Sequence, residues 1–445
     1  MLAHSRMAPI TVEATEVDEN RQSPMNIALL DILKCLPHIR ELSLMQPQSE
    51  NGSGVGDVPF LEQVVARLDG PAPLLESLKI SYFYFNYAVT PILSRGTPLL
   101  RHLELSKTSI PWWSTLFDGL VSLRLFTPSL SIPVLVLTSI LARMPNLEEA
   151  HLSWVIAPPY HGLVRGNEAA SLPRISQLHL EDELAHCVAF FNNVTVPPTT
   201  VLHTSCIPDV AYDRPDTSMY LETLITSVMQ DRHHVYALYV HANEFSAWNE
   251  SSPVHGRKRP AKSDVPFINF SDVPPDLTWP DFFMIWNVLP MGGLTSACME
   301  DVIAPKEDWI GFLGALEALE DLEIVRRESG FLAAFSSGIS CQELSFLGAV
   351  TPGRLKFRRL RRLTFREWCP RDYGGQRHID ILKTCLRERC KRGRGLQRLN
   401  LQDCAEVHAD DIMDFNRVVM HVVSVSGREE DGSKDHEEEM RNAVN

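Results

Sequence analysis

A short apolar phrase with the spacing Leu-x-x-Leu-x-Leu recurs along the chain and constrains its fold more than any other feature. Nine copies occur when isoleucine, alanine or phenylalanine is allowed at the leucine positions, and five of them carry a proline two residues upstream. The copies begin at Ile39, Leu75, Leu100, Leu120, Leu147, Ile175, Leu319, Leu360 and Leu396. Agreement in both the spacing and the upstream proline indicates a structural repeat.

The last two apolar residues of each copy are two positions apart, so an extended strand would place them on one face. The leading apolar residue would enter the core just before that strand, and the proline would end the preceding element. One such strand cannot bury its apolar face alone, but stacked copies cover one another. The residue between the paired apolar positions is polar in every copy: Ser43, Lys79, Glu104, Arg124, His151, His179, Glu323, Thr364 and Asn400.

Candidate helices lie between the copies. Residues 25–36, 60–68, 134–144 and 378–392 carry apolar residues at helical spacing, and each segment ends shortly before a copy. The order helix, turn, strand predicts an α/β fold, namely an irregular, helix-containing leucine-rich-repeat solenoid of horseshoe shape with a parallel concave sheet. Equivalent leucines are between 20 and 41 residues apart within the two repeat-bearing parts. Loops are therefore expected between the repeat units.

The predicted solenoid spans residues 25–426. A loop-rich insertion is expected at about 244–280, where proline, serine and charged residues gather. Residues 1–24 are predicted to be a disordered N-terminal segment, and residues 427–445 an acidic disordered tail.

Several features of the sequence are typical of an intracellular protein. No stretch reaches the roughly 18 apolar residues of a membrane span, and the first 25 residues lack the apolar core of a secretory signal. The nine cysteines are odd in number and include no CxxC pair, which is typical of reduced thiols. We expect a cytoplasmic protein without a membrane partner, and a basic cluster at 257–262 leaves nuclear entry open.

No catalytic motif is evident. The sequence contains no phosphate-binding loop, nucleophile elbow, zinc-protease motif, kinase motif or metal-ligand cluster. We therefore expect no enzyme activity, no catalytic residues, no cofactor and no metal site.

The charge distribution argues against nucleic acid as a general partner, because the net charge is −14. Residues 354–398 are the exception, with sixteen Lys or Arg against four acidic residues. One interpretation is a surface that binds an acidic partner or nucleic acid. The alternative is a solvated face that the acidic tail partly neutralises.

The repeated phrase, with Leu172-Pro-Arg-Ile-Ser-Gln-Leu-His-Leu180 in mid-chain, resembles the F-box/leucine-rich-repeat proteins of mushroom-forming (basidiomycete-type) fungi. The resemblance covers roughly 25–200 and 310–425 and rests on repeat style. It implies that the repeats hold a protein substrate while an F-box docks the adaptor of a cullin-RING ubiquitin ligase. No F-box is visible in this sequence, so that adaptor is expected as a partner only if an F-box exists outside this chain.

The sequence thus predicts a protein–protein interaction module resembling the substrate-recognition repeats of an F-box protein. The alternative is a stand-alone leucine-rich-repeat scaffold without ubiquitin-ligase coupling. A parallel sheet would present the residues between the paired leucines side by side to an unidentified protein partner, although any of them could be a solvated strand residue only. The candidate binding residues are Glu104, Arg124, His151, His179, Glu323, Thr364 and Asn400.

Overall fold

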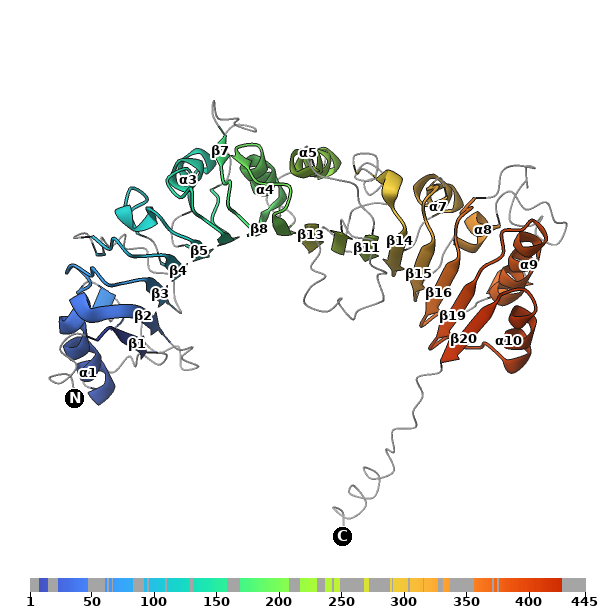
Figure 1. Cartoon of the computed structure of the whole chain (residues 1–445), viewed down its shortest axis with the longest axis horizontal. Coiled ribbons are helices and arrows are strands. Elements are labelled where there is room, and N and C mark those ends of the chain that lie inside the picture. The colour runs from blue at the N-terminus through green and yellow to red at the C-terminus, as the bar shows by residue number, and fades with distance from the viewer. Residues whose placement is uncertain are drawn as a thin grey trace, which may run out of the picture. The chain divides into compact units, whose positions relative to one another are not determined.

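Figure 1 shows the computed structural model of the chain. The chain forms two compact units, which are described separately. Unit 1 comprises Met1–Arg232 and Phe267–Pro274, and unit 2 comprises His233–Pro266 and Pro275–Asn445. The structure describes residues 8–14, 23–46, 61, 64–65, 67–82, 92–93, 96–108, 110–128, 131–157, 169–207, 217–229, 237–241, 244–248, 268–271, 289, 291–302, 305–314, 316–326, 331–336, 356–369, 372–373 and 376–425.

Parallel strands form the main sheet of unit 1. Each strand pairs in parallel with its neighbour, and equivalent positions stay in register from one strand to the next. Across the sheet the strands are β1 (Ile10–Ala14), β2 (Ile39–Met45), β3 (Ser77–Ser81), β4 (His102–Ser106), β5 (Ser122–Phe126), β6 (Glu149–Ser153), β8 (Gln177–Glu183), β10 (Val201–Ile207) and β13 (Ile268–Ser271). A separate small parallel pair consists of β7 (Ala170–Ser171) and β9 (Val194–Thr195).

Helices of unit 1 cover one side of this sheet, where α3, α4 and α5 lie (Figure 1). Short 3-10 turns complete the connections between strands. The elements are α1 (Pro24–Ile32), η1 (Leu33–His38), η2 (Thr115–Phe117), α3 (Val134–Leu141), α4 (Leu184–Phe191) and α5 (Thr217–Met229).

Unit 2 repeats the same arrangement of strand and helix. Its sheet begins with the antiparallel hairpin of β11 (Ala237–His241) and β12 (Glu244–Trp248), and β11 pairs in parallel with β14. The parallel strands that follow are β14 (Ser296–Glu300), β15 (Asp321–Val325), β16 (Arg362–Arg366), β19 (Arg398–Gln402) and β20 (His421–Val425). The other elements are η3 (Met291–Gly293), α7 (Lys306–Phe312), α8 (Phe331–Phe335), α9 (His378–Lys391), α10 (Ala409–Asn416) and the short hairpin of β17 (Asp372–Tyr373) and β18 (Gln376–Arg377).

The repeated apolar phrase supplies the core of both units. All three apolar positions in each of the nine copies are at most 2% exposed. Each copy forms a strand, and these strands are β2 to β6, β8, β15, β16 and β19. The sequence-based prediction of a buried leading residue followed by a strand that buries its two paired apolar residues is therefore confirmed at every copy.

The turn that follows the strands is also repeated. In seven cases the residue just after the strand has a left-handed φ between 40° and 66°, and none of the seven is a glycine. Its N–H donates to a carbonyl of the next strand, as from Thr127 to Ser153 at 2.7 Å and from Asp403 to Val425 at 2.8 Å. The seven residues are Lys107, Thr127, Trp154, Asp301, Arg326, Glu367 and Asp403.

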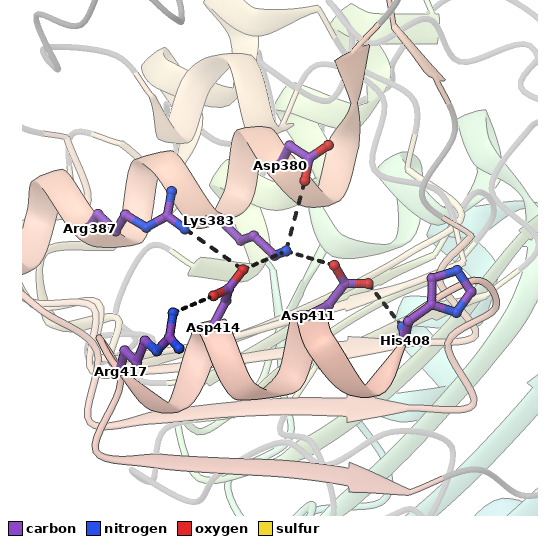
Figure 2. Close-up of polar contacts among 7 residues, drawn as sticks. All are labelled: Asp380, Lys383, Arg387, His408, Asp411, Asp414 and Arg417. Carbon is purple, nitrogen blue, oxygen red and sulfur yellow. Dashed lines mark hydrogen bonds and ion pairs between the residues drawn. The ribbon is translucent and has the colours of Figure 1, made fainter.

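The C-terminal helices of unit 2 are joined by a polar network (Figure 2). Lys383 of α9 is only 11% exposed and contacts Asp411 at 2.7 Å and Asp414 at 3.0 Å, both on α10. Asp411 also accepts a hydrogen bond from the His408 N–H at the start of α10. Burial lowers the pKa of Lys383, but the hydrogen bonds to the two aspartates outweigh burial and raise that pKa above its ordinary value. The network therefore fixes α10 against α9.

One predicted segment is wrong in part. Residues 1–24 are not entirely disordered, because Ile10–Ala14 form β1, with Val12 and Ala14 directed into the core. The insertion predicted to be loop-rich at about 244–280 contains the short strands β12 and β13 among its described residues. Both segments hold short alternating runs of apolar and polar residues, which the prolines and charges around them obscure.

Other predicted segments are described in part or not at all. The helices expected at 25–36, 134–144 and 378–392 are present as α1 with η1, α3 and α9, within a few residues of their predicted bounds. Of the helix expected at 60–68, residues 61, 64 and 65 are helical and residues 67 and 68 form a turn, and the others lie outside the described residues. The tail at 427–445 and the basic cluster at 257–262 lie outside the described residues.

Candidate partner-binding face

Four of the predicted site residues lie side by side on the sheet of unit 1. Glu104 pairs in register with Arg124, Arg124 with His151, and His151 with His179. The same register adds Lys79 before them and His203 after them. We call these six residues the unit 1 row. They point away from the buried leucines of the same strands, so they lie on the face opposite the core.

Charged residues occupy one half of the unit 1 row. Lys79 lies 2.7 Å from Glu104, and Arg124 lies 4.0 Å from the same carboxylate. The Arg124 guanidinium donates from Nε and Nη2 to Glu149 at 3.2 and 2.6 Å. These side chains are between 23% and 43% exposed, so solvent screens each pair and its contribution to stability is small. The charges are thus arranged across the face without being removed from solvent.

Aromatic rings occupy the other half. His151 and His179 stack with ring centroids 4.1 Å apart and ring planes 3° apart, and His203 continues the stack 5.5 Å from His179. Phe126 closes the other end, edge-on to His151 with centroids 4.5 Å apart. Burial lowers the pKa of His151 to about 4, assisted by the neighbouring His179 and Arg124. Burial also lowers the pKa of His179, so both rings are neutral at pH 7.

Several residues of this face were not predicted from the sequence. His203 was missed because β10 carries Thr204, which is 2% exposed, where the repeated phrase requires a leucine. Phe126, Glu149 and Glu181 were missed because only the central residue of each strand was considered. Residues two positions before or after the central residue of a strand lie on the same face. This alternation is the sequence signal that identifies Phe126, Glu149 and Glu181.

The three predicted residues of unit 2 also share one register. Glu323 pairs with Thr364, and Thr364 with Asn400. The Asn400 side-chain amide donates to the Thr364 hydroxyl at 3.1 Å and accepts from Arg398 at 2.8 Å. Glu323 differs from the expectation of a surface residue, because it is 7% exposed and lies 3.3 Å from Arg366. Thr364 and Asn400 are therefore the accessible part of the predicted set in this unit.

Carboxylates of unit 2 neutralise part of the basic stretch at 354–398. Three arginines on or beside β16 pair with three acidic residues on or beside β15. The pairs are Arg361 with Glu320 at 3.9 Å, Arg362 with Asp321, and Arg366 with Glu323 at 3.3 Å. Arg389 is fully buried, donates to the carbonyls of Lys356 and Phe357, and stacks over Phe335. Several of these cations therefore have structural partners within the unit.

Neither a metal cluster nor a membrane-spanning helix occurs in the described part of the chain. No group of three or more His, Cys, Asp or Glu residues in it is arranged to hold a metal ion. None of its helices has the length and apolar character needed to cross a membrane.

No protein-family model matches the sequence, and no curated protein matches it either.

Proposed function

We propose that this chain is a leucine-rich-repeat solenoid whose polar sheet face binds a protein partner. The observation that carries the proposal is the unit 1 row, in which six polar or charged side chains from six adjacent strands stand in register. Repeat proteins use such extended faces for binding, because one residue of each repeat is presented at a regular spacing. The unit 2 residues Thr364 and Asn400 offer a second, shorter stretch of the same kind.

The repeat itself supports the solenoid part of the proposal. Every copy of the phrase contributes one buried leading residue and one parallel strand. Left-handed turns recur after the strands in both units. Successive repeats therefore share the same strand, the same turn and the same hydrogen bond to the next strand. Such stacking of equivalent repeats is the defining property of a repeat array.

We propose that the chain acts in the cytoplasm by binding its partner, without catalysis, a cofactor or a metal. The charged side chains of the unit 1 row, Lys79, Glu104 and Arg124, remain between 23% and 43% exposed. Exposed charges of both signs suit recognition by complementary charge, which favours specificity and rapid association. An acidic or nucleic-acid partner at 354–398 has less support, because Arg366 and Lys383 are only 17% and 11% exposed and Arg389 is fully buried.

The F-box resemblance adds one further expectation. If it holds, the bound protein would be a substrate that is presented to a cullin-RING ubiquitin ligase. Contact with the ligase adaptor would require an F-box outside this sequence, so ligase coupling is a separate question from protein binding.

Affinity capture with the full chain as bait tests the proposal. The bait would be compared with a face variant carrying Glu104→Ala, Arg124→Ala and His179→Ala, all on the unit 1 row. A matched control would carry Leu135→Ser and Val136→Ser, which are exposed at 43% and 39% on α3, on the helical side of the unit. Mass spectrometry would identify the captured proteins, and thermal melting would verify that both variants fold.

We expect a set of proteins that the wild-type chain and the α3 variant capture but the face variant does not. Capture that is insensitive to the face variant, or lost only in the α3 variant, would contradict binding through this face. Recovery of a cullin and its adaptor with the same bait would support ligase coupling, and their absence would contradict it for this chain.

A further inference from the structure

A continuous line of four rings crosses the unit 1 face between β5 and β10. It consists of Phe126, His151, His179 and His203, in that order. The imidazoles come from equivalent positions of adjacent in-register strands. His179 is stacked between the other two imidazoles, and it is still partly exposed. The accessible part of His179 is therefore its edge, where the ring nitrogens lie.

Neutral imidazole edges offer hydrogen-bond acceptors. A neutral histidine has one ring N–H donor and one ring nitrogen with a free lone pair. Because burial lowers the pKa of His151 and His179, neither ring carries a charge that would repel a cation at neutral pH. The line of rings can thus accept hydrogen bonds from a positively charged group.

Carboxylates border the line on both sides. Glu149 lies two residues before His151 on β6, and Glu181 lies two residues after His179 on β8. Arg124 neutralises Glu149. Glu181 accepts a hydrogen bond from the Ser153 hydroxyl at 2.8 Å, and no Lys or Arg among the described residues pairs with it. Glu181 therefore provides a negative charge beside neutral acceptors.

The face as a whole carries a net negative charge. It comprises the positions in register with Glu104 and those two residues before and after them. On β1 to β10 these positions hold five glutamates against two cations, Lys79 and Arg124. The glutamates are Glu13, Glu41, Glu104, Glu149 and Glu181. A partner that complements this face would be basic.

We propose that the His179–Glu181 region docks an arginine side chain from a basic segment of the partner protein. The guanidinium has five N–H donors in a planar fork, so it can bond to the Glu181 carboxylate and to an imidazole nitrogen together. A lysine ammonium lacks this fork and fits less well. The inference deepens the proposed function and rests on it, because it specifies the chemistry of the protein partner.

Fluorescence anisotropy with a labelled peptide of alternating glycine and arginine tests the proposal. The full chain would be titrated against this peptide and against its glycine–lysine counterpart at low and moderate salt. Two variants probe the site: Glu181→Gln, which removes the charge at constant shape, and His179→Phe, which keeps a ring in the stack but removes its nitrogens. Glu148→Gln is the matched control, because Glu148 is exposed and lies outside the defined face.

We expect Glu181→Gln to weaken binding of the arginine peptide roughly tenfold, as for the loss of one charge-assisted hydrogen-bonded pair. His179→Phe should weaken it by a smaller factor, and Glu148→Gln should leave it unchanged. Equal binding by wild type and Glu181→Gln, or an equal loss in Glu148→Gln, would overturn the proposal, as would equal binding of the lysine peptide. Capture from cell extract does not use this peptide, so its result judges protein binding by the face independently.

Discussion

His151 and His179 stack face to face from neighbouring strands, with ring centroids 4.1 Å apart and ring planes 3° apart. The cause is the parallel register, because strands about 4.8 Å apart bring equivalent side chains to the separation of stacked rings. Protonation of His151 would place a positive charge against its neighbour His179 and against Arg124. The stack is therefore stable with neutral rings, which makes unit 1 sensitive to acid.

Stability of unit 1 should fall as the pH drops below 6.5. The folded-state pKa of His151 is about 4, below the value of about 6.5 in an unfolded chain. The unfolded chain then binds the proton more readily, so the contribution of the neutral ring is present above pH 6.5 and is lost as the pH falls towards 4. We expect a loss on the order of 1–2 kcal/mol, reduced by the partial exposure of the ring. Urea unfolding at a series of pH values measures it.

The pH effect should depend on His151 itself. His151→Gln removes the titrating group, so the unfolding free energy of this variant should change less between pH 7 and pH 4.5 than that of the wild type. His38→Gln, at an exposed position before β2, serves as the control and should keep the wild-type dependence. An unchanged pH dependence in His151→Gln would show that the stack is not the source.

Leu178 and Gln177 provide a test of the strand assignment within one strand. Leu178 is 1% exposed, whereas its neighbour Gln177 is exposed on the other face of β8. Leu178→Ala should lower the free energy of unfolding by about 2–5 kcal/mol, because it leaves a cavity in the core. Gln177→Ala should change it by at most about 0.5 kcal/mol. Similar urea midpoints for the two variants would show that β8 does not bury this face.

Replacement of Thr127 by asparagine should stabilise the protein. It has a φ of 40°, which is strained for a β-branched residue and which asparagine adopts more readily. The N–H that donates to Ser153 is a backbone group and is kept in the variant. Thr127→Asn should therefore raise the free energy of unfolding by about 0.5–1 kcal/mol.

The control for Thr127 is Ser106→Asn, because Ser106 lies in the extended strand β4, where asparagine relieves no strain. Thermal melting would compare both variants with the wild type. A lower melting temperature for Thr127→Asn would mean that its threonine side chain makes a contact worth more than the strain.

The strands that carry the leucine phrase could be predicted from the sequence, whereas the strand β10 could not be recognised by that phrase. Leu103 and Leu105 repeat a pattern that eight other copies share, so comparison within the chain was sufficient to find them. In β10 the equivalent positions are Leu202 and Thr204, and burial of the threonine hydroxyl follows from its position in the sheet. A polar residue in a core position cannot be recognised by an apolar pattern.

The candidate site could likewise be predicted only in part from the sequence. The register of Glu104 with Arg124 follows from the repeat, since equivalent positions of parallel strands are neighbours. Whether such a residue is accessible does not follow, because Glu323 occupies the same repeat position and is buried against Arg366. The exposure of such a residue depends on the side chains that cover its strand, and those side chains come from residues distant in the sequence.

Lys383 should contribute far more to the stability of unit 2 than the more exposed Arg387, which contacts the same aspartate, Asp414. It is 11% exposed between Asp411, which is 5% exposed, and Asp414, whereas Arg387 is 47% exposed and 3.9 Å from Asp414 (Figure 2). Lys383→Met keeps the length of the side chain but leaves Asp411 buried without its cation, at a cost of about 2–4 kcal/mol. Arg387→Met should cost less than about 1 kcal/mol.

Acid should reduce the stability of α10 by a larger amount in the wild type than in Lys383→Met. The hydrogen bond from Lys383 lowers the pKa of Asp414, so its stabilising contribution is present above the unfolded value and is lost as the pH falls through the lower folded one. In Lys383→Met that contribution is absent, so the decrease in stability of α10 below pH 4 should be smaller. Amide hydrogen exchange across Ala409–Asn416 follows the helix directly. Equal exchange rates in Lys383→Met and Arg387→Met would mean that packing of Phe415, which is fully buried, and not the ion network, holds α10 in place.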